Sequence, residues 1–459
     1  MRRKETYLKF VLFFGDIFLI YLALLLTLAL RYKDFSLLPG PQTRVFIFHF
    51  SFIYIIWFLL LFILDFYEIP PFKKISNFLS SLTIFSFLAG SLGAIYFYLQ
   101  PLLIFTPKTI LFLNVFIFSI LILFWRLIIN YLLHLKNFKE KIGIIGFRPE
   151  LQEILFSQHF KDIYEIIVFL NPTLFFSGEE VKFSNLVRYG TVNNIFDFKK
   201  IIEKEKVSSV VFALDFRENK ELASQIFSNL PLKLNYISFS DFYESLTKKV
   251  PLEALNEVWF LENLSRAERK IDSLFKRLFD IFFSFFGFLI VVILFPFISL
   301  AIRIDSQGPI FYTQKRTGKE GKIFTVYKFR TMKENPNQKE EVWREKKENQ
   351  ITMVGKVLRK IHLDEFPQFW SILRGDLSFV GPRPEWVELA KIFEKEIPFY
   401  SQRYLIKPGF TGWAQINFPA SLSVREAKEK FEYDLYYIKN RSFFLDLAII
   451  LKTIRIIFR

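Results

Sequence analysis

Four long apolar runs near the start of the chain constrain its fold more than any other feature of the sequence. They cover residues 7 to 30, 45 to 64, 77 to 99 and 109 to 133. A helix needs about 20 apolar residues to cross the hydrocarbon core of a bilayer, and each run is close to that length. The sequence therefore predicts a membrane protein whose residues 1 to 135 form a four-helix transmembrane domain.

The basic residues beside these runs predict the orientation of the bundle. The first run is too long for a signal peptide and lacks a small-residue cleavage site, so we expect it to remain as an anchor. Loops rich in Lys and Arg stay on the cytoplasmic side of a membrane. One side would carry Arg2, Arg3, Lys4, Lys9, Lys73, Lys74, Lys136, Lys139 and Lys141, and the other Arg31, Lys33, Arg44 and Lys108. We therefore expect the N-terminus and everything after residue 135 to be cytoplasmic.

Two ionisable residues, Asp16 and Arg126, fall inside the apolar runs. A charged group is expensive at this depth and usually faces a partner within the bundle. An ion pair that joins two helices is the favoured interpretation, and a transport site is the alternative.

The composition excludes several classes of site. The chain has no Cys, which rules out disulfides, catalytic thiolates and Cys-ligated metals, and its four His are too scattered to predict a zinc site. The formal net charge of +16 suits anionic partners such as lipid headgroups, lipid phosphates and nucleotides. No nucleic-acid-binding motif accompanies this charge, so we expect membrane lipid and no nucleic acid among the partners.

Residues 141 to 260 alternate between short β-rich runs and charged helical stretches. The β-rich runs are KIGIIGF, IYEIIVFL, VSSVVFALD and LKLNYISF. This alternation predicts a small doubly wound parallel sheet, in a Rossmann-like α/β domain. Gly143 and Gly146 lie in the first run, but no third glycine completes the dinucleotide fingerprint, so nucleotide binding and a simple glycine turn both stay open. A charged linker is predicted over residues 261 to 273.

A fifth apolar stretch, residues 278 to 304, is long enough to cross a bilayer but contains Pro296. Proline removes a helix hydrogen bond and kinks or breaks the helix. Basic residues flank both ends of the stretch, which indicates that both ends stay on the cytoplasmic side. We therefore predict a re-entrant helix kinked at Pro296, with a straight fifth crossing as the alternative.

The stretch LDEFPQFWSILRGDLSFVGPRPE, residues 363 to 385, concentrates acidic, basic and turn-forming residues. Pro367 is tolerated only in the first turn of a helix. We therefore expect a helix that begins near Leu363 or Asp364, and Gly375 supplies a natural stop.

Asp364 and Glu365 would then sit at the positive end of this helix, where a carboxylate stays ionised and a phosphate is attracted. Arg359 and Lys360, one turn upstream, add cationic groups for the same anion. Neighbouring residues on a helix point about 100° apart, so the two acids suit separate tasks better than a shared proton. An ordinary capping acid is the alternative interpretation of such a pair.

Several dense motifs occur together in the last part of the chain. They are KRLFDIFF before the kink, GPIFYTQKRTGKEGKIFTVYKFRTMK at 308 to 333, the acidic stretch, and RYLIKPGFTGWAQINF at 403 to 418. In this order they resemble the bacterial sugar transferase family of polyprenyl-phosphate glycosylphosphotransferases. The resemblance implies an α-rich catalytic domain over residues 274 to 459 that includes the re-entrant helix. The preceding four spans and α/β domain are similar to those of its large, full-length members.

The resemblance also implies a two-step exchange at the bacterial cytoplasmic (inner) membrane. Asp364 attacks the β-phosphorus of a nucleotide-diphosphate sugar, by family analogy a uridine-linked one, while Glu365 helps to hold Mg²⁺. The phosphosugar on Asp364 then passes to polyprenyl phosphate, which initiates exopolysaccharide, capsule or O-antigen repeat synthesis. The residue types fit, because phosphoryl transfer needs an in-line nucleophile, a divalent ion and basic groups around the phosphate.

Phosphate-binding residues around the acids are assigned by the same resemblance. Arg359 and Arg383 are expected to bind phosphate, with the geometry of Arg383 fixed by Pro382 and Pro384. The other residues expected at the substrate or its phosphate are Lys328, Arg330, Gln314, Arg316, Arg403, Thr411 and Gln415, with Gly409 and Gly412 in a turn. Lys328 and Arg330 would share one face of an extended segment while Phe329 packs on the other.

One departure from the family pattern concerns the segment after GWAQIN. Phe418, Pro419 and Ala420 replace a glycine-arginine-asparagine turn, which removes one basic contact or leaves it to Arg403 or Arg425. Substrate choice would differ accordingly.

The C-terminal run FEYDLYYIKNRSFFLDLAIILKTIRIIFR interleaves aromatic, Leu and Ile residues with Lys452, Arg455 and Arg459. Such an amphipathic segment is expected to lie on the membrane surface, beside the lipid substrate. Asp446 and the basic residues argue against another crossing.

A competing hypothesis is a membrane scaffold or regulator of polysaccharide assembly, in which the α/β domain binds a nucleotide and the acid pair is structural. An oxidoreductase or epimerase that uses the α/β domain fails on the incomplete glycine fingerprint. Self-association into a homo-oligomer is left open.

Overall fold

The computed structural model divides the chain into two compact units, Met1–Thr247 and Lys248–Arg459. These are called unit 1 and unit 2. The structure describes residues 2–32, 41–67, 75–99, 108–134, 140–146, 148–156, 160, 164–170, 206–213, 234–264, 270–333, 350–418 and 423–457.

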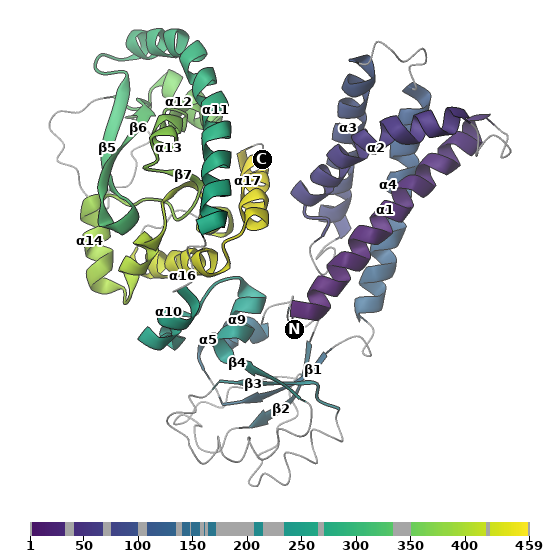
Figure 1. Cartoon of the computed structure of the whole chain (residues 1–459), viewed down its shortest axis with the longest axis horizontal. Helices are drawn as coiled ribbons and strands as arrows, with labels where there is room; N and C mark the ends of the chain where they lie inside the picture. The colour runs from purple at the N-terminus through teal and green to yellow at the C-terminus, as the bar shows by residue number, and fades with distance from the viewer. Residues whose placement is uncertain are drawn as a thin grey trace. The chain divides into compact units, whose positions relative to one another are not determined.

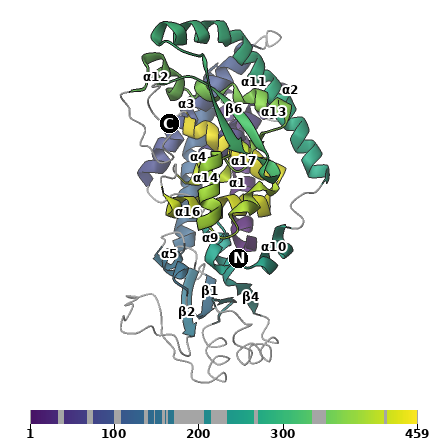
Figure 2. The same cartoon turned by 90° about the vertical axis from the view of Figure 1, so that its left-hand side faces the viewer.

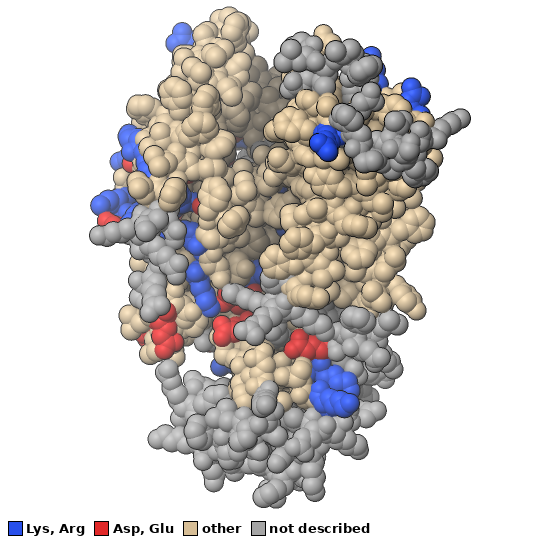
Figure 3. Space-filling model, turned by 45° about the vertical axis from the view of Figure 1, so that its right-hand side comes forward, with Lys and Arg blue, Asp and Glu red and all other residues tan. Residues whose placement is uncertain are grey.

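Four long helices open unit 1 (Figure 1). They are α1 (Arg2–Tyr32), α2 (Pro41–Ile63), α3 (Ile75–Tyr98) and α4 (Lys108–His134). Each contains a segment long and apolar enough to cross a membrane: Tyr7–Tyr32, Arg44–Ile63, Phe78–Tyr98 and Lys108–Leu133. In Figure 3 the side of this bundle that faces the viewer is almost free of charged side chains among its described residues. The helices confirm the four apolar runs predicted from the sequence.

The bundle core is built around fully buried aromatic side chains. Trp57 of α2 stacks on Phe118 of α4 and meets Phe85 of α3 edge-on, with ring centroids 5.9 Å apart in both pairs. Such pairs contribute about 0.5–1.5 kcal/mol each beyond the area that they bury. Some of the many Phe residues therefore serve to pack the helices together.

Asp16 of α1 and Arg126 of α4 form an ion pair inside the bundle, which confirms the predicted pairing. Arg126 Nη1 donates to Asp16 Oδ1 at 2.9 Å and Nη2 to Oδ2 at 2.6 Å, and both side chains are fully buried. Arg126 Nε donates to Phe66 O at 3.2 Å. The charges are thus paired and hydrogen-bonded, which is the condition under which buried ions are tolerated.

A four-stranded parallel sheet forms the second part of unit 1. Its strands are β1 (Glu140–Ile145), β2 (Tyr164–Leu170), β3 (Ser209–Phe212) and β4 (Asn235–Ser238), in the order β2-β1-β3-β4. Helices α5 (Glu150–Phe156) and α9 (Phe239–Thr247) accompany it. The parallel sheet agrees with the sequence prediction, but most of the predicted helices NNIFDFKKIIEKEK and NKELASQIFSNL lies outside the described residues. Gly146 has a φ of 85°, so the first strand does end in a glycine turn.

The segment after residue 247 belongs to unit 2. The 3-10 helix η4 (Leu252–Ala254) and α10 (Glu257–Leu264) place Val250 and Phe260 in the core of that unit. The sequence assigned residues up to 260 to the α/β domain. The boundary between the compact units lies earlier, because the apolar side chains of this segment pack on the C-terminal helices.

Unit 2 contains the fifth helix that is long and apolar enough to cross a membrane, α11 (Lys270–Asp305). Pro296 lies inside it. Figures 1 and 2 both show that α11 changes direction along its length, and a proline in a helix interior is a sufficient cause. The sequence-based expectation of a bent helix is therefore met.

The remaining elements form the compact body of unit 2. They are β5 (Phe311–Thr317), η5 (Lys319–Gly321), β6 (Ile323–Phe329), α12 (Met353–Lys360), η7 (Leu363–Glu365), α13 (Gln368–Arg374), β7 (Ser378–Val380), α14 (Val387–Glu396), η8 (Tyr400–Leu405), β8 (Gly409–Thr411), α15 (Trp413–Asn417), α16 (Val424–Asn440) and α17 (Phe443–Ile457). Strands β5 and β6 make an antiparallel hairpin, and β7 and β8 pair in parallel. Pro419 and Ala420 of the predicted departure lie outside the described residues.

The buried ion pair of the bundle predicts a strong energetic coupling between α1 and α4. Arg126→Leu should lower the free energy of unfolding by about 3–5 kcal/mol, because it leaves the Asp16 carboxylate buried without a counter-charge. The double variant Asp16→Leu/Arg126→Leu should recover most of that loss. Unfolding in detergent micelles measures both, with Arg44→Leu on the exposed start of α2 as the control. Additive losses from the two single variants would contradict the coupling.

Candidate active site

Asp364 and Glu365 lie in the 3-10 turn η7, between α12 and α13. His362, just before it, has a φ of 55°, a left-handed conformation that is uncommon for a residue with a side chain. Pro367 caps the start of α13, and Gly375 ends that helix with a φ of 97°. The predicted helix stop is confirmed, and the predicted start is a 3-10 turn that leads into the α-helix.

Glu365 is held by two cations from distant parts of the chain. Lys328 Nζ donates to Glu365 Oε1 at 2.6 Å, and Arg383 Nη2 donates to the same oxygen at 2.7 Å. Burial by itself would raise the pKa of Glu365, but the charges and hydrogen bonds of Arg383 and Lys328 outweigh it and hold the pKa well below its usual range. This carboxylate is therefore ionised and fixed in place.

Asp364 has a different environment. It makes no hydrogen bond or ion pair with any residue that the structure describes, and it is only partly buried. Burial and the neighbouring charge of Glu365 raise its pKa, against the opposing effect of Lys328, Arg359 and His362. The two adjacent acids thus have different surroundings: Glu365 is bonded to two cations, and Asp364 has no bonded partner among the described residues. Two carboxylates whose surroundings shift their pKa values in opposite directions usually have different chemical roles.

Lys328 reaches the acids from the hairpin β5–β6. It alternates along β6 with Phe329, which is 2% exposed and stacks on Phe311 at 5.5 Å between ring centroids. Arg330 lies past the end of the strand and donates to Gln307 O and Ser306 O, each at 2.7 Å, at the C-terminal end of α11. The structure therefore brings Lys328 to Glu365, while Arg330 holds the backbone that directly follows α11.

Arg383 projects from the turn GPRPE, residues 381 to 385, whose backbone groups are bonded to other elements. The hydrogen bonds are Gly381 N to Thr411 O (2.9 Å), Gly409 N to Pro382 O (2.9 Å), Arg403 Nη2 to Arg383 O (2.8 Å), Arg316 Nη1 to Pro384 O (2.7 Å) and Thr317 N to Glu385 O (3.1 Å). Strands β5 and β8 and helix η8 thus fix the turn. Together with the two prolines, they aim Arg383 at Glu365.

Arg316 forms part of this support. Its Nη2 donates to Gln314 Oε1 at 2.7 Å, and its guanidinium lies 5.6 Å from the ring centroid of Trp386. Burial lowers the pKa of Arg316 to about 10, although Glu385 opposes the shift. Arg316 and Gln314 therefore lie together, as predicted, and Arg316 also contacts the GPRPE turn that carries Arg383.

A buried charge network lies behind the turn, and most of its members have no signal in the local sequence. Arg403, whose side chain is 3% exposed, donates to Asp434 Oδ2 at 2.9 Å and also bonds Tyr400 Oη. Lys430 donates to Glu385 Oε1 at 2.5 Å. The Lys430 and Arg403 charges outweigh burial and lower the pKa of Glu385 to about 2. Each buried charge therefore has an opposite charge beside it.

Arg359 lies close enough to affect Asp364 electrostatically, and its Nε donates to Thr331 Oγ1 at 2.8 Å. Thr411 and Gln415 bond other parts of unit 2. Thr411 Oγ1 lies 2.6 Å from Thr453 Oγ1 of α17, and Gln415 Nε2 donates to Phe410 O at 3.3 Å.

Gly409 and Gly412 differ from the predicted turn role. A Cβ on Gly409 would lie 2.1 Å from Gly381 N, and one on Gly412 would lie 2.2 Å from Gly381 O. Glycine is required at both positions because the backbone of β8 runs against the GPRPE turn.

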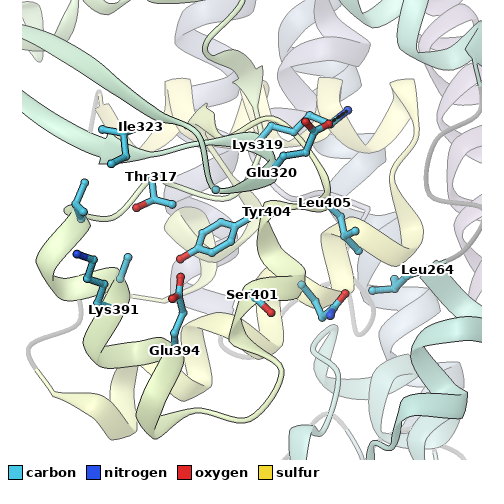
Figure 4. A pocket seen from close by; sticks show the side chains of 14 residues that line it. Leu264, Thr317, Lys319, Glu320, Ile323, Lys391, Glu394, Ser401, Tyr404 and Leu405 are labelled. Carbon is cyan, nitrogen blue, oxygen red and sulfur yellow. Dashed lines mark ion pairs between the residues drawn. The ribbon is translucent and has the colours of Figure 1, made fainter.

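A cavity of about 860 Å³ lies between the tip of the hairpin, α14 and η8, and neither acid lines it (Figure 4). Tyr404 and Glu394 point toward one another there. Burial, with Glu394 beside it, raises the pKa of the Tyr404 hydroxyl, which therefore stays protonated at neutral pH. This cavity is thus separate from the cluster formed by the acids, Lys328 and Arg383.

Comparisons with known proteins support the same region. The family model described as bacterial sugar transferase matches residues 271–459. A UDP-N-acetylgalactosamine-undecaprenyl-phosphate N-acetylgalactosaminephosphotransferase of Aeromonas hydrophila is 42% identical over 159 residues, which are 35% of this chain and 38% of that protein. The uncharacterized sugar transferase EpsL of Bacillus subtilis is 39% identical over 180 residues, 39% of this chain and 85% of that protein.

A longer match also covers part of the α/β domain. A UDP-glucose:undecaprenyl-phosphate glucose-1-phosphate transferase of Klebsiella pneumoniae is 32% identical over 262 residues, 57% of this chain and 56% of that protein. The chain thus spans 38% and 56% of the Aeromonas and Klebsiella relatives, but 85% of EpsL. Because most of EpsL is covered and the acid–cation cluster falls within the matched region, the chain belongs to the bacterial sugar transferase family.

Proposed function

We propose that this protein transfers a sugar 1-phosphate from a nucleotide-diphosphate sugar to polyprenyl phosphate. The observation that carries the proposal is the contrast between the two acids. Glu365 is committed to Lys328 and Arg383, whereas Asp364 has no bonded partner among the described residues. An open carboxylate beside fixed cations is suited to attack a phosphorus atom whose oxygens those cations neutralise.

The exchange takes two displacements at one phosphorus atom. An oxygen of Asp364 forms a bond to the β-phosphorus, and the bond from that phosphorus to the bridging oxygen breaks, so that the nucleoside monophosphate leaves with the bonding electrons. A phosphate oxygen of polyprenyl phosphate then attacks the same phosphorus, and the bond to Asp364 breaks. The products are polyprenyl-diphospho-sugar and the regenerated carboxylate. Both nucleophiles are anions, so neither attack requires a proton to be removed.

The cations around the acids have distinct tasks in this scheme. Arg383 and Lys328 fix Glu365 and face the oxygens of the incoming diphosphate. Arg359 uses its Nε for Thr331, and no described residue takes up its two Nη groups, which suits them to a phosphate. The charges of Lys328, Arg359 and His362 limit the rise in the pKa of Asp364 that burial and Glu365 cause.

Mg²⁺ belongs to the proposal as a cofactor. The described residues contain no cluster of three or more His, Asp or Glu side chains that would hold a metal alone. Mg²⁺ in phosphoryl-transfer sites uses one or two carboxylates together with substrate phosphates, and the ionised Glu365 is the carboxylate that would hold it. When bound, the ion would neutralise charge on the diphosphate.

The substrate classes follow from the relatives. The Aeromonas and Klebsiella proteins are named for UDP-sugar donors and undecaprenyl-phosphate acceptors. We propose the same classes here, in the initiation of polysaccharide repeat synthesis.

The re-entrant path of α11 is also proposed, with both ends at the cytoplasmic face of the bacterial inner membrane. Near the start of α11, Arg277 donates to Ile372 O and Leu373 O of α13, each at 2.6 Å. At its end, Asp305 accepts from Val354 N of α12 at 2.7 Å. A straight helix of this length would extend about 54 Å. Contacts of both ends with one small catalytic body favour a bent path that returns to the same side.

Asp364→Asn should abolish the reaction, because an amide does not form the acyl phosphate. We expect nucleoside monophosphate release and lipid labelling to fall by at least about 10³-fold. Membranes with the protein, polyprenyl phosphate, Mg²⁺ and radiolabelled UDP-sugars provide the assay. Asp376→Asn, a carboxylate paired with Arg374 after α13, is the matched control. Lipid labelling by Asp364→Asn at the parental rate would eliminate this nucleophile and favour a scaffold.

The raised pKa of Asp364 predicts an acid limit of activity above that of an ordinary aspartate, because the ionised form is the nucleophile. Arg359→Gln removes a positive charge that lowers this pKa, so the acid limb of the pH profile should move to higher pH. Single-turnover release of nucleoside monophosphate between pH 4 and pH 8 measures it, and Lys360→Gln at the next, exposed position is the control. A shift of the limb to lower pH would contradict the assignment.

Metal removal should stop the first displacement. With excess EDTA we expect no covalent phosphosugar on the protein, and added Mg²⁺ should restore it. Intact-protein mass spectrometry after incubation with donor alone gives the readout. Formation of the intermediate at the full rate in EDTA would remove Mg²⁺ from the mechanism.

A further inference from the structure

A groove of about 800 Å³ runs between the first half of α11 and the start of α17. Most of its wall is apolar and aromatic. The lining side chains are Phe275, Lys276, Leu278, Phe279, Ile281, Phe282, Phe283, Arg441, Ser442, Phe443 and Asp446. None of the residues assigned to the two displacements lines it.

The polar groups at the floor of the groove are bonded to one another. Lys276 Nζ donates to Asp446 Oδ2 at 2.5 Å and to Tyr437 Oη at 3.2 Å, and Tyr437 Oη donates to Asp446 Oδ1 at 2.6 Å. The lysine and aspartate side chains are 17% and 10% exposed. Because their charges are paired, they do not call for a polar ligand, and the groove offers a long apolar surface instead.

The groove and the reacting acids share one aromatic cluster. Phe279 and Phe283 line the groove and also contact Phe379, with ring centroids 6.3 and 6.4 Å apart. Phe379 contacts Phe369 at 5.6 Å, and Phe369 contacts Phe366 at 5.2 Å. Phe366 follows Glu365 directly in the chain, so an unbroken row of rings joins the groove to the turn that carries the acids.

The helix that forms one wall of the groove, α11, leaves most of its apolar side chains exposed. Only 11% of the most apolar window of α11 is buried within the protein, against 28–39% for the other membrane segments. The rings that line the groove therefore lie on a helix whose apolar face is left open to lipid, while Phe369, 7% exposed, connects them to the acid-bearing turn through the core.

We propose that this groove holds the polyprenyl chain of the acceptor, and thereby positions its phosphate for the second displacement. The inference rests on the proposed function for the identity of the acceptor. An isoprenoid chain is branched, flexible and apolar throughout, so it can follow a curved wall of phenylalanine rings and leucine without leaving a polar group unpaired. The groove acts only after the phosphosugar is on Asp364.

Two matched pairs of variants test the groove by kinetics. Phe282 lines it and Phe285, one turn away on α11, does not, although the two rings are 57% and 56% exposed. Phe443 lines it, and its neighbour Phe444 does not. We expect Phe282→Ala and Phe443→Ala to raise the KM for long-chain polyprenyl phosphate by about tenfold, since each removes a large apolar contact. Phe285→Ala and Phe444→Ala should leave that KM unchanged.

The donor half of the reaction separates this proposal from the proposed function. Nucleoside monophosphate release without acceptor should be the same in all four variants and the parent protein. If the parent protein releases none, the proposed function fails. If it releases the nucleotide normally while groove and control variants share one acceptor KM, the groove assignment alone is wrong.

Photolabelling tests occupancy without turnover. A polyprenyl phosphate with a diazirine at the far end of its chain should label peptides that contain residues 275–283 or 441–446 in protein reconstituted into nanodiscs. Unlabelled polyprenyl phosphate should suppress that labelling, and an equal amount of phosphatidylglycerol should not. Equal suppression by phosphatidylglycerol would identify a general lipid contact, and labelling confined to other peptides would place the chain elsewhere. Either result overturns the proposal.

Discussion

One carboxylate shared between two cations holds the reacting turn in place. Glu365 accepts from Lys328, 37 residues before it, and from Arg383, 18 residues after it. Because these groups are largely shielded from water, the loss of Glu365 would leave two cations side by side without their counter-charge. The hairpin, the 3-10 turn and the GPRPE turn therefore form as one arrangement. Burial, with the fixed charge of Glu365 beside it, raises the pKa of Asp364.

The cations are held in turn by a second set of buried charges. Arg403 donates a hydrogen bond to the backbone of Arg383, and Asp434 neutralises the charge of Arg403. Lys430 neutralises Glu385. The bonds of Arg403 and Arg316 to the backbone of the turn restrict the directions in which Arg383 can point. The open side, which carries Asp364 and Arg359, is where the proposed function places the anionic donor. The side of the turn with Arg403 and Glu385 is fixed because each of these charges is paired. The side with Asp364 is open because no described residue bonds that carboxylate.

Sequence reasoning predicted the parts of the fold that depend on hydropathy and on the cost of an unpaired charge. Hydropathy identified the membrane helices, and the cost of an isolated charge predicted that Asp16 would meet Arg126. Period-two alternation placed Lys328 opposite Phe329; in the structure Lys328 bonds Glu365, and Arg330 bonds Ser306 O and Gln307 O. Sequence reasoning placed the two acids at a helix terminus and expected Lys328 and Arg383 at the substrate phosphate. In the structure the acids lie in a 3-10 turn, and both cations bond Glu365. Contacts between distant segments, such as Gly409 against Gly381 or Thr411 against Thr453, leave no periodic signal.

The long helix α11 connects the chemistry to the bilayer. Arg277 and Asp305, near its two ends, bond α13 and α12, and the turn with the acids lies between those two helices. The depth of the reacting carboxylate is therefore set by a helix whose outer face is apolar. Under the proposed function, a donor dissolved in water and an acceptor anchored in lipid react at one phosphorus atom only if Asp364 stays at the boundary between the two phases. A bent helix with both ends tied to one small body supplies that restraint, and a groove on the same helix would place the lipid tail at a fixed distance from the carboxylate.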